Sequence, residues 1–339
     1  MKVALIYDEP TPGGDGSWVE AEYESPQTIQ ALLAAIECHC DEAVGVPFDA
    51  ELVDRLRAED PDMALNIAEG REGPSRESIV PAVLELLGIP YTGSDGVALG
   101  VSLNKALTKR LAGDLGVRTP PFLLAHSPEQ AERRAQDLPY PVLLKPNFGG
   151  SSVGISPESI VHAPDELPCA VGRALARYEQ PCLVEAYVEG QDLTIGLLGN
   201  EELEVLPPAQ VITPGGIYGE MAKRLHEREV VCPCSVPPEA AECAAARAVD
   251  IFGAIGARDF ARADFLLDDE GRVWFLEINP LPGLSPFYGV LPVLAEAAGY
   301  AHEELIGRIM ALALQRSESR ERTTHGPLAE RAAQQHPHR

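Results

Sequence analysis

In the first part of the chain, short apolar runs alternate with segments whose apolar positions recur at helical spacing. Three runs have the length and residue types of buried strands: KVALIY, AVGVPF and DMALNIA. The segments between and after them predict helices over 26–38, 50–57 and 75–88, the last ending at Gly88 because glycine is favoured just past a helix. This alternation predicts an α/β domain over residues 1–96.

A second unit of strands and helices follows. The turn-rich stretch GIPYTGSDG precedes a helix expected over 102–115. From residue 119 to residue 188 the pattern is strand, helix, strand, glycine-rich loop, strand, helix, strand. We therefore assign residues 97–188 to a central domain that carries the glycine-rich loop.

The last part of the chain begins with an alternating strand, QDLTIGLLGN, and then predicts a helix over 238–256 and two helices within 290–315. Between these helices, the runs FARADFLLD and RVWFLEIN are joined by an Asp-Glu-Gly turn, which is a strong hairpin signal. We assign 189–316 to a C-terminal domain. The segment 317–339 is polar, lacks apolar periodicity and is expected to be a disordered tail.

Composition narrows the range of partners. The formal net charge of −25 argues against nucleic acid, because binding to a phosphate backbone relies on clustered Lys and Arg. No apolar run reaches the roughly 18 to 20 residues that span a bilayer, and the N-terminus lacks a signal-peptide pattern, so we expect a cytoplasmic protein without a membrane partner. The 7 cysteines are scattered and odd in number, which favours reduced thiols over disulfides or a zinc site.

The stretch LLKPNFGGSSVGIS carries the first candidate chemistry. Lys145 ends a predicted strand, and the glycines that follow let backbone N–H groups converge on one point, as in an anion-binding nest. The spacing is neither that of a P-loop nor that of a dinucleotide site. An ordinary hairpin loop with a surface lysine remains an equal alternative.

The predicted hairpin carries the second candidate site. Period-two alternation places Arg262 and Asp264 on one face of the first strand, and Glu277 and Asn279 on one face of the second. Two carboxylates and an amide oxygen are ligands that suit Mg²⁺. The alternative is a cross-strand salt bridge between Arg262 and Glu277. A third segment, CLVEAYVEGQD, has acids that either contact adenine and ribose or are solvated strand ends.

Five motifs in this order make the chain resemble the D-alanine–D-alanine ligase family of ATP-grasp enzymes up to about residue 315: GIPYTGSD, NKALTKRL, KPNFGGSSVGIS, VEAYVEGQD and RADFLLDDEGRVWFLEINPLPGLSP. The resemblance implies an α/β ATP-grasp fold, in which a Rossmann-like N-terminal domain on the first-substrate side joins two α+β domains that sandwich ATP. It also implies a reaction. ATP phosphorylates a carboxylate and leaves as ADP, and an amine then attacks the acyl phosphate to give an amide and phosphate.

The resemblance further implies roles for individual residues. Lys105 and Lys145 would contact the phosphates of ATP under the glycine-rich loop, and Asp192 would bind the ribose. The residues expected around ATP are Lys105, Lys145, Gly150, Ser151, Ser152, Glu185, Ala186, Tyr187, Val188 and Asp192. Two Mg²⁺ ions would be held by Asp264, Glu277 and Asn279.

Catalytic and substrate-binding roles follow from the same resemblance. Arg262 and the N–H of Gly283 would stabilise the oxyanion, and Lys223 matches a loop lysine of the family. Glu24 would hold the ammonium of the first substrate, with Ser151 linking that acid to the loop. Glu24 is alternatively only the residue before a helix, because Ser and Pro follow it and both suit a helix start.

The sequence departs from the family on the acceptor side. Arg224 stands in place of a lid tyrosine, Tyr288 in place of a serine, and a longer loop adds Arg71 and Arg76. We therefore predict an acceptor that is larger or more anionic than D-alanine, although Arg71 and Arg76 are alternatively plain surface charges. The other two interpretations are a genuine D-alanine–D-alanine ligase and a nucleotide-binding regulator without turnover. Small amino-acid-like substrates are expected as partners, and the resemblance implies a homodimer.

Overall fold

The N-terminal apolar runs form the parallel sheet that their pattern predicts. The computed structural model describes residues 1–10, 19–150, 153–212 and 229–324. The central strand β1 pairs in parallel with β2 on one side and β3 on the other. The strands are β1 (Lys2–Tyr7), β2 (Glu42–Pro47) and β3 (Met63–Asn66). The helices are α1 (Pro26–Glu37), α2 (Leu52–Glu59) and α3 (Ile79–Leu87), with the 3-10 turns η1 (Val19–Glu22) and η2 (Arg76–Ser78).

The ends of the N-terminal helices follow their local signals. Ser25 caps α1, since its side chain accepts a hydrogen bond from the N–H of Thr28 and Pro26 takes the first helical position. Gly88 ends α3 with a φ of 71°, a left-handed conformation that glycine adopts without strain. The predicted helix ends therefore hold to within a few residues.

The predicted helix over 102–115 is two helices, α4 (Gly96–Leu103) and α5 (Lys105–Asp114). They meet at Asn104, whose side chain accepts a hydrogen bond from the N–H of Leu107 and so caps α5. The N–H of Lys105 bonds to the backbone oxygen of Asn147, a residue of the glycine-rich loop region. Apolar periodicity describes residues that are close in the chain, so it could not predict this long-range bond. Helix α5 packs against the predicted C-terminal hairpin and against helix α9 (Pro238–Ile255).

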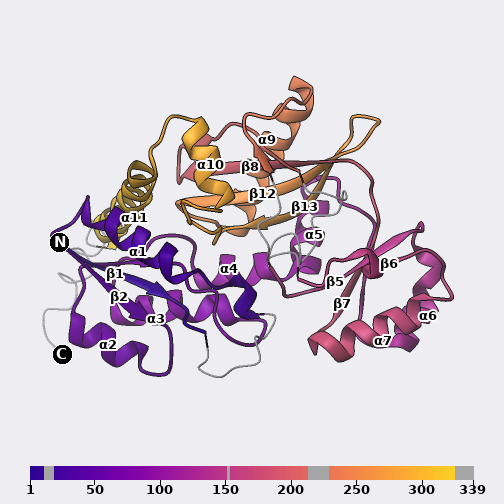
Figure 1. Ribbon diagram of the computed structural model, residues 1–339, viewed down its shortest axis with the longest axis horizontal. Helices are drawn as coiled ribbons and strands as arrows, with labels where there is room; N and C mark the ends of the chain where they lie inside the picture. The colour runs from indigo at the N-terminus through magenta and orange to yellow at the C-terminus, as the bar shows by residue number, and fades with distance from the viewer. Residues whose placement is uncertain (11–18, 151–152, 213–228, 325–339) are drawn as a thin grey trace, which may run out of the picture.

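The central segment forms an antiparallel sheet in the order β4-β7-β5-β6, covered by two helices that pack on each other (Figure 1). The strands are β4 (Phe122–Ala125), β5 (Val142–Pro146), β6 (Ile160–Val161) and β7 (Cys182–Ala186). The helices are α6 (Pro128–Arg134) and α7 (Leu167–Tyr178), with η3 (Ala135–Asp137) and η4 (Pro157–Ser159). This part of the chain has its own hydrophobic cluster.

The C-terminal segment forms a second antiparallel sheet, in the order β13-β12-β8-β9. The strands are β8 (Gln191–Gly199), β9 (Leu203–Val205), β12 (Phe260–Leu267) and β13 (Val273–Asn279), with the short pair β10 (Gln210–Ile212) and β11 (Glu229–Val231). The helices are α9 (Pro238–Ile255), α10 (Val290–Ala297) and α11 (His302–Thr324). The predicted tail began at residue 317, but α11 continues to Thr324, because its polar residues include good helix formers that extend a helix already packed.

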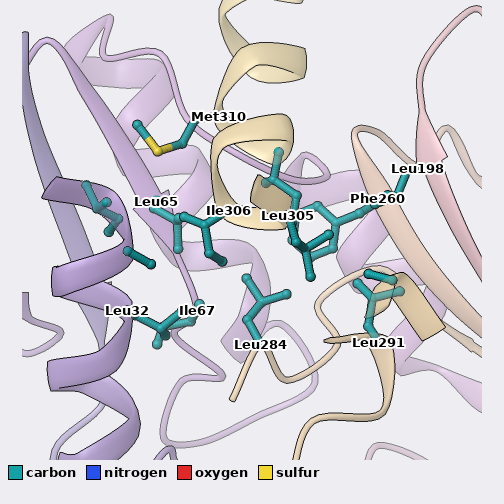
Figure 2. Packing of buried hydrophobic residues seen from close by; sticks show 14 of the residues in the cluster. Leu32, Leu65, Ile67, Leu198, Phe260, Leu284, Leu291, Leu305, Ile306 and Met310 are labelled. Carbon is teal, nitrogen blue, oxygen red and sulfur yellow. The ribbon is translucent and has the colours of Figure 1, made fainter. Parts of the chain in front are cut away.

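The N-terminal and C-terminal segments share one continuous core. Helix α11 lies beside α1 (Figure 1). Figure 2 shows Leu65 of β3 with Ile306 and Met310 of α11, and Phe260 of β12 nearby, all in the same buried cluster. The cluster joins elements from both ends of the chain, so the predicted units 1–96 and 189–316 pack as one body.

A buried acid reinforces this junction. Asp259 is fully buried and accepts hydrogen bonds from the N–H of Gly93, the side chain of Asn200 and the guanidinium of Arg316. These partners come from the GIPYTGSDG turn, from the end of β8 and from α11. In the described ranges, no helix combines the length and apolarity that a membrane span requires. All 7 cysteines are free.

Candidate active site

A pocket lies between the central and C-terminal sheets, with walls from β5, from the link between β7 and β8, and from the β12–β13 hairpin. It therefore brings together side chains predicted separately to bind phosphate, nucleoside and metal. The predicted residues that line it are Lys105, Lys145, Gly150, Tyr187, Val188, Asp192, Arg262, Asp264, Glu277 and Asn279. Ala186 and Glu185 are buried behind this lining.

The two predicted phosphate lysines enter the pocket from different elements. Lys105 is the first residue of α5, and Lys145 lies near the end of β5. Each is paired with an acid: Lys105 with Glu277, and Lys145 with Glu185 at 2.5 Å. The lysines therefore face a pocket in which anionic partners already hold their ammonium groups in place.

Glu185 lies between two lysines, and one of them was missed by the sequence analysis. Lys109 is fully buried, with its Nζ 2.9 Å from Glu185 Oε2 and donating to Thr119 Oγ1 at 2.9 Å. Burial lowers the pKa of Lys109 to about 8 despite the nearby Glu185. Burial raises the pKa of Glu185, but Lys109 and Lys145 outweigh it and leave that pKa below its usual value. The signal for Lys109 was its position one helical turn after Lys105.

On the hairpin, the register sets the four predicted residues opposite one another in pairs. Arg262 lies opposite Asn279, and Asp264 lies opposite Glu277. The alternative of an Arg262–Glu277 salt bridge is wrong, because the Arg262 guanidinium donates to both carboxylate oxygens of Asp264, at 2.8 to 3.1 Å. Burial raises the pKa of Glu277, yet Lys105 and Lys145 bring it down to about 2. Glu277 is therefore ionised throughout the working pH range.

The same face of the hairpin fits a magnesium ion. It offers the carboxylates of Asp264 and Glu277 and the amide oxygen of Asn279, which the N–H of Leu281 orients from 2.8 Å. In the part of the chain that the structure describes, no group of three or more His, Cys, Asp or Glu forms a metal cage. An ion here would therefore draw its remaining ligands from nucleotide phosphates, as Mg²⁺ commonly does.

One side of the pocket is lined by Tyr187, Val188 and Asp192, the residues expected to contact the nucleoside. The backbone N–H of Tyr187 bonds to the oxygen of Pro141, which ties this link to the central sheet. Burial, and then the charge of Asp264, raises the pKa of Asp192 to about 7. The predicted ribose acid is thus close to its point of protonation at neutral pH.

Three predicted residues meet outside the pocket, between the start of α1 and the turn that follows β13. The Tyr288 hydroxyl donates to Glu24 at 2.5 Å. A Cβ on Gly283 would lie 2.9 Å from Glu24 Oε1. Tyr288, predicted on the acceptor side, thus lies against the acid predicted to hold the first substrate. The helix-start interpretation of this segment holds at the same time, because Ser25 caps α1.

Glu22, which the sequence analysis missed, is the acid that contacts the glycine-rich loop. Its Oε1 accepts the N–H of Gly150 at 2.5 Å, and its Oε2 accepts from Arg76 at 2.5 Å. Arg76 also donates to the backbone oxygen of Phe148 at 3.0 Å. Only the alternation of acids in the stretch AEYE hinted at Glu22, since it lies two residues before Glu24.

Arg76 is not a surface charge. Its side chain is 1% exposed and lies among the acids Glu22, Glu69 and Glu77. Burial, reinforced by the neighbouring carboxylates, raises the pKa values of Glu69 and Glu77 above their usual range. Arg71, by contrast, is exposed. The predicted residues Ser151, Ser152, Lys223 and Arg224 lie outside the described residues.

Comparisons with known proteins identify relatives of this chain. The family model described as "D-ala D-ala ligase C-terminus" matches residues 111–311. A D-alanine–D-alanine ligase of Moorella thermoacetica is 30% identical over 323 residues, which is 93% of this chain and 100% of the relative. An uncharacterized protein, y4sG, of Sinorhizobium fredii is 35% identical over 264 residues, 75% of each chain.

Solved structures agree on the fold. A D-alanine–D-alanine ligase from Bacillus anthracis, complexed with ATP, superposes with a TM-score of 0.74 over 94% of this chain and 99% of that chain, at 21% identity. The VanG D-Ala:D-Ser ligase from Enterococcus faecalis gives a TM-score of 0.71 at 20% identity, over 92% and 99%. The extent of the family match and of the sequence relatives shows that the chain belongs to the D-alanine–D-alanine ligase family and is an ADP-forming ATP-grasp ligase.

Proposed function

We propose that the protein uses ATP and Mg²⁺ to activate the carboxylate of one amino-acid-like substrate and joins it to the amine of a second substrate other than D-alanine. The observation that carries the proposal is the pocket that places Lys105 and Lys145 opposite the acidic hairpin. A carboxylate is a poor electrophile, so a group that leaves as phosphate must first be attached to it. The cations and acids of this pocket suit that transfer.

Each pocket residue would have a separate task. Lys105 and Lys145 would exchange their acid partners for phosphate oxygens, so that their ammonium groups would stabilise the negative charge of the phosphoryl group being transferred. Asp264, Glu277 and Asn279 would hold two Mg²⁺ ions, and these ions would neutralise charge on the phosphates. Arg262, already oriented by Asp264 and largely buried, would stabilise the oxyanion when the amine attacks the acyl phosphate. The N–H of Gly283 would be the second donor to that oxyanion.

Residues of the pocket would hold the nucleotide, and the N-terminal segment would hold the glycine-rich loop. Tyr187 and Val188 line the pocket where the base would lie, and Asp192 where the ribose would lie. The bond from Gly150 to Glu22 supports a role for the glycine-rich loop as a cover anchored to the N-terminal segment. Such a cover would keep water from the acyl phosphate.

The acceptor is proposed to differ from D-alanine because the hydroxyl of Tyr288 is engaged by Glu24 rather than turned to a substrate. The anionic acceptor predicted earlier has less support. Arg76 is buried among acids, which leaves only Arg71 and the undescribed Arg224 as candidate cations. The second candidate, formation of D-alanyl-D-alanine, is favoured by relatives of that name along almost the whole chain. A homodimer remains part of the proposal.

The deciding experiment is phosphate release from ATP and Mg²⁺ across single amino acids and pairs of them, with mass spectrometry of the products. Reactions without an amino acid serve as the blank. Turnover with an amine other than D-alanine, and an amide of matching mass, supports the proposal. Efficient formation of D-alanyl-D-alanine from D-alanine alone favours the second candidate. No amino-acid-dependent turnover with any pair contradicts both.

A further inference from the structure

Thr194 lies in a row of three pocket side chains that crosses the C-terminal sheet. In β8 it is paired with Asp264 of β12, and Asp264 is paired on its other side with Glu277 of β13. Residues paired in this way point to the same face of a sheet. All three line the pocket. Thr194 therefore belongs to the same surface as two proposed metal ligands, although the sequence analysis did not single it out.

The position of the Thr194 side chain is closely fixed. Its backbone N–H donates to the oxygen of Ala209 at 2.8 Å, and its backbone oxygen accepts from the N–H of Ala209 at 2.9 Å. Thr194 is 3% exposed and Ala209 is fully buried. A β-branched side chain has few rotamers open to it. The hydroxyl of Thr194 is therefore held in one place by the sheet.

The hydroxyl of Thr194 donates to Asp264 Oδ1 at 2.9 Å. Asp264 has a second orienting neighbour, because the Arg262 guanidinium donates to both of its carboxylate oxygens. The side chain of Asp264 is still 20% exposed, so a cation can reach it. A carboxylate offers about four lone-pair sites, and the hydroxyl occupies one of them. Thr194 therefore orients Asp264 and leaves it able to bind a metal ion.

Thr194 and Arg262 differ in what the proposed reaction asks of them. Arg262 carries a positive charge, which competes with a metal ion for the negative charge of Asp264. Arg262 is also the proposed donor to the oxyanion, and its hydrogen bonds to Asp264 are weakened or lost while it donates there. The hydroxyl of Thr194 is neutral and has no such second role. It can hold Asp264 in the same orientation at every stage of the reaction.

We infer that Thr194 is a positioning residue whose hydroxyl keeps the Asp264 carboxylate in the orientation that binds the metal ion when Arg262 turns to the oxyanion. The inference rests on the proposed function, in which Asp264 is a metal ligand, and it adds a residue that acts through that ligand. Hydrogen bonds to the ligands of a metal ion commonly change its affinity about tenfold or more, because they fix the orientation of the ligand. The alternative is a hydroxyl that only satisfies a buried strand position and does not affect metal binding.

The first test measures metal binding without turnover. Mn²⁺ takes the place of Mg²⁺ in the complex of the full chain with ADP, and the electron paramagnetic resonance signal of the free ion gives its dissociation constant. Thr194→Val keeps the shape of the side chain and is expected to raise this constant about tenfold. Thr194→Ser retains a hydroxyl and is expected to bind Mn²⁺ nearly as the wild type does. Thr194→Ala takes the place of the valine variant if circular dichroism shows that the valine variant does not fold.

Thr108→Val is the matched control for this measurement. Thr108 is 1% exposed, and its hydroxyl donates to the backbone oxygen of Val101 at 2.6 Å. The control therefore also removes a buried hydroxyl that donates to an oxygen, but its partner is not a proposed metal ligand. It is expected to leave the dissociation constant of Mn²⁺ unchanged. Equal constants for Thr194→Val and Thr108→Val overturn the inference.

The second test uses the substrate pair that the amino-acid screen identifies. Thr194→Val is expected to raise the Mg²⁺ concentration at half-maximal turnover about tenfold and to leave the KM of both amino-acid substrates unchanged. A hydroxyl with only a structural role would lower stability without this selective change, so an unchanged Mg²⁺ requirement overturns the inference.

Asp264→Asn distinguishes failure of the inference from failure of the proposed function. If Asp264→Asn binds Mn²⁺ as tightly as the wild type, the metal assignment of the proposed function fails, and the inference fails with it. If Asp264→Asn loses Mn²⁺ while Thr194→Val keeps it, the inference alone fails. Weakened binding in both variants, with Thr194→Ser close to the wild type, is the expected result.

Discussion

Two groups of buried charges flank the candidate active site, and carboxyl pKa values shift in opposite directions in the two groups. Beside the pocket, Lys105, Lys109 and Lys145 stand against Glu185 and Glu277. On the N-terminal side, Arg76 stands among Glu22, Glu69 and Glu77. The first group contains more cations than acids, and the second contains more acids than cations.

The difference shows in the pKa values. Burial raises the pKa of Glu69, Glu77, Glu185 and Glu277, but beside the pocket the lysines more than offset it, so the pKa of Glu277 falls to about 2. On the N-terminal side the single cation of Arg76 does not offset the effect of burial on both Glu69 and Glu77, and the pKa of Glu77 rises to about 8. Excess positive charge suits a pocket that receives phosphates. Excess acid suits a region that takes up protons or meets an ammonium.

The largest expected effect comes from removing the charge of Glu277. Glu277→Gln is expected to lower ATP turnover by at least about a hundredfold, because the hairpin loses a proposed metal ligand and Lys105 loses its partner. Steady-state phosphate release measures this effect, and circular dichroism checks that the fold is intact. Turnover equal to that of the wild type would contradict the metal assignment.

The next effect is on stability and concerns Lys109. Lys109→Met is expected to lower the free energy of unfolding by about 3 to 5 kcal/mol, since it leaves Glu185 buried with one cation instead of two. Urea denaturation measures the loss. Arg134→Met is the matched control, because the Arg134–Asp137 pair is exposed and worth about 1 kcal/mol or less. A loss no larger than the control's would mean that Lys145 alone satisfies Glu185.

A smaller loss is expected for Arg76→Met, about 2 to 3 kcal/mol. The pKa values of Glu69 and Glu77 are raised, so these two acids take up protons readily when the cation is lost, whereas the pKa of Glu185 lies below its usual value. Adding Glu22→Gln is expected to restore part of the stability, because it removes one of the unpaired acids. If Arg76→Met costs as much as Lys109→Met, the two groups do not differ as described.

The smallest effect is a change in pH dependence. The pKa of Glu77 is raised in the folded protein, so as pH rises this carboxyl keeps its proton after the unfolded chain has lost it. Its contribution to the free energy of unfolding is therefore fully present below about pH 4.5 and is lost as pH rises toward 8. Replacing Glu77 with Gln is therefore expected to flatten the fall in unfolding free energy between pH 5 and 8, by at most about 1.4 kcal/mol per pH unit. Glu242→Gln, at an exposed position of α9, serves as the control. The same slope in both variants would contradict the raised pKa.

Local sequence signals were sufficient for most elements of the fold. The Asp-Glu-Gly turn predicted the β12–β13 hairpin, and the alternation along its strands predicted that Asp264 and Glu277 lie on one face. Gly88 marked the end of α3. These features depend on residues close in the chain, where conformational preference and period decide the outcome.

Contacts between distant residues were not predictable in the same way. The break between α4 and α5 at Asn104 is held by Asn147, whose side chain accepts from Ala106 and donates to Asn104. The contact of Glu22 with Gly150 likewise joins segments far apart in the chain. Periodicity describes one segment at a time, so neither pairing left a signal in the sequence.

The sequence by itself determined the chemistry of this protein: which lysines, acids and glycines are available, and their order along strands, helices and turns. The tertiary structure alone decided which charges share a buried space. It placed Lys109 against Glu185, Arg76 against Glu22, and Tyr288 against Glu24. The physical reason is that a side chain's charge, hydrogen bonds and pKa depend on its neighbours within a few ångströms, and folding brings those neighbours from distant parts of the chain.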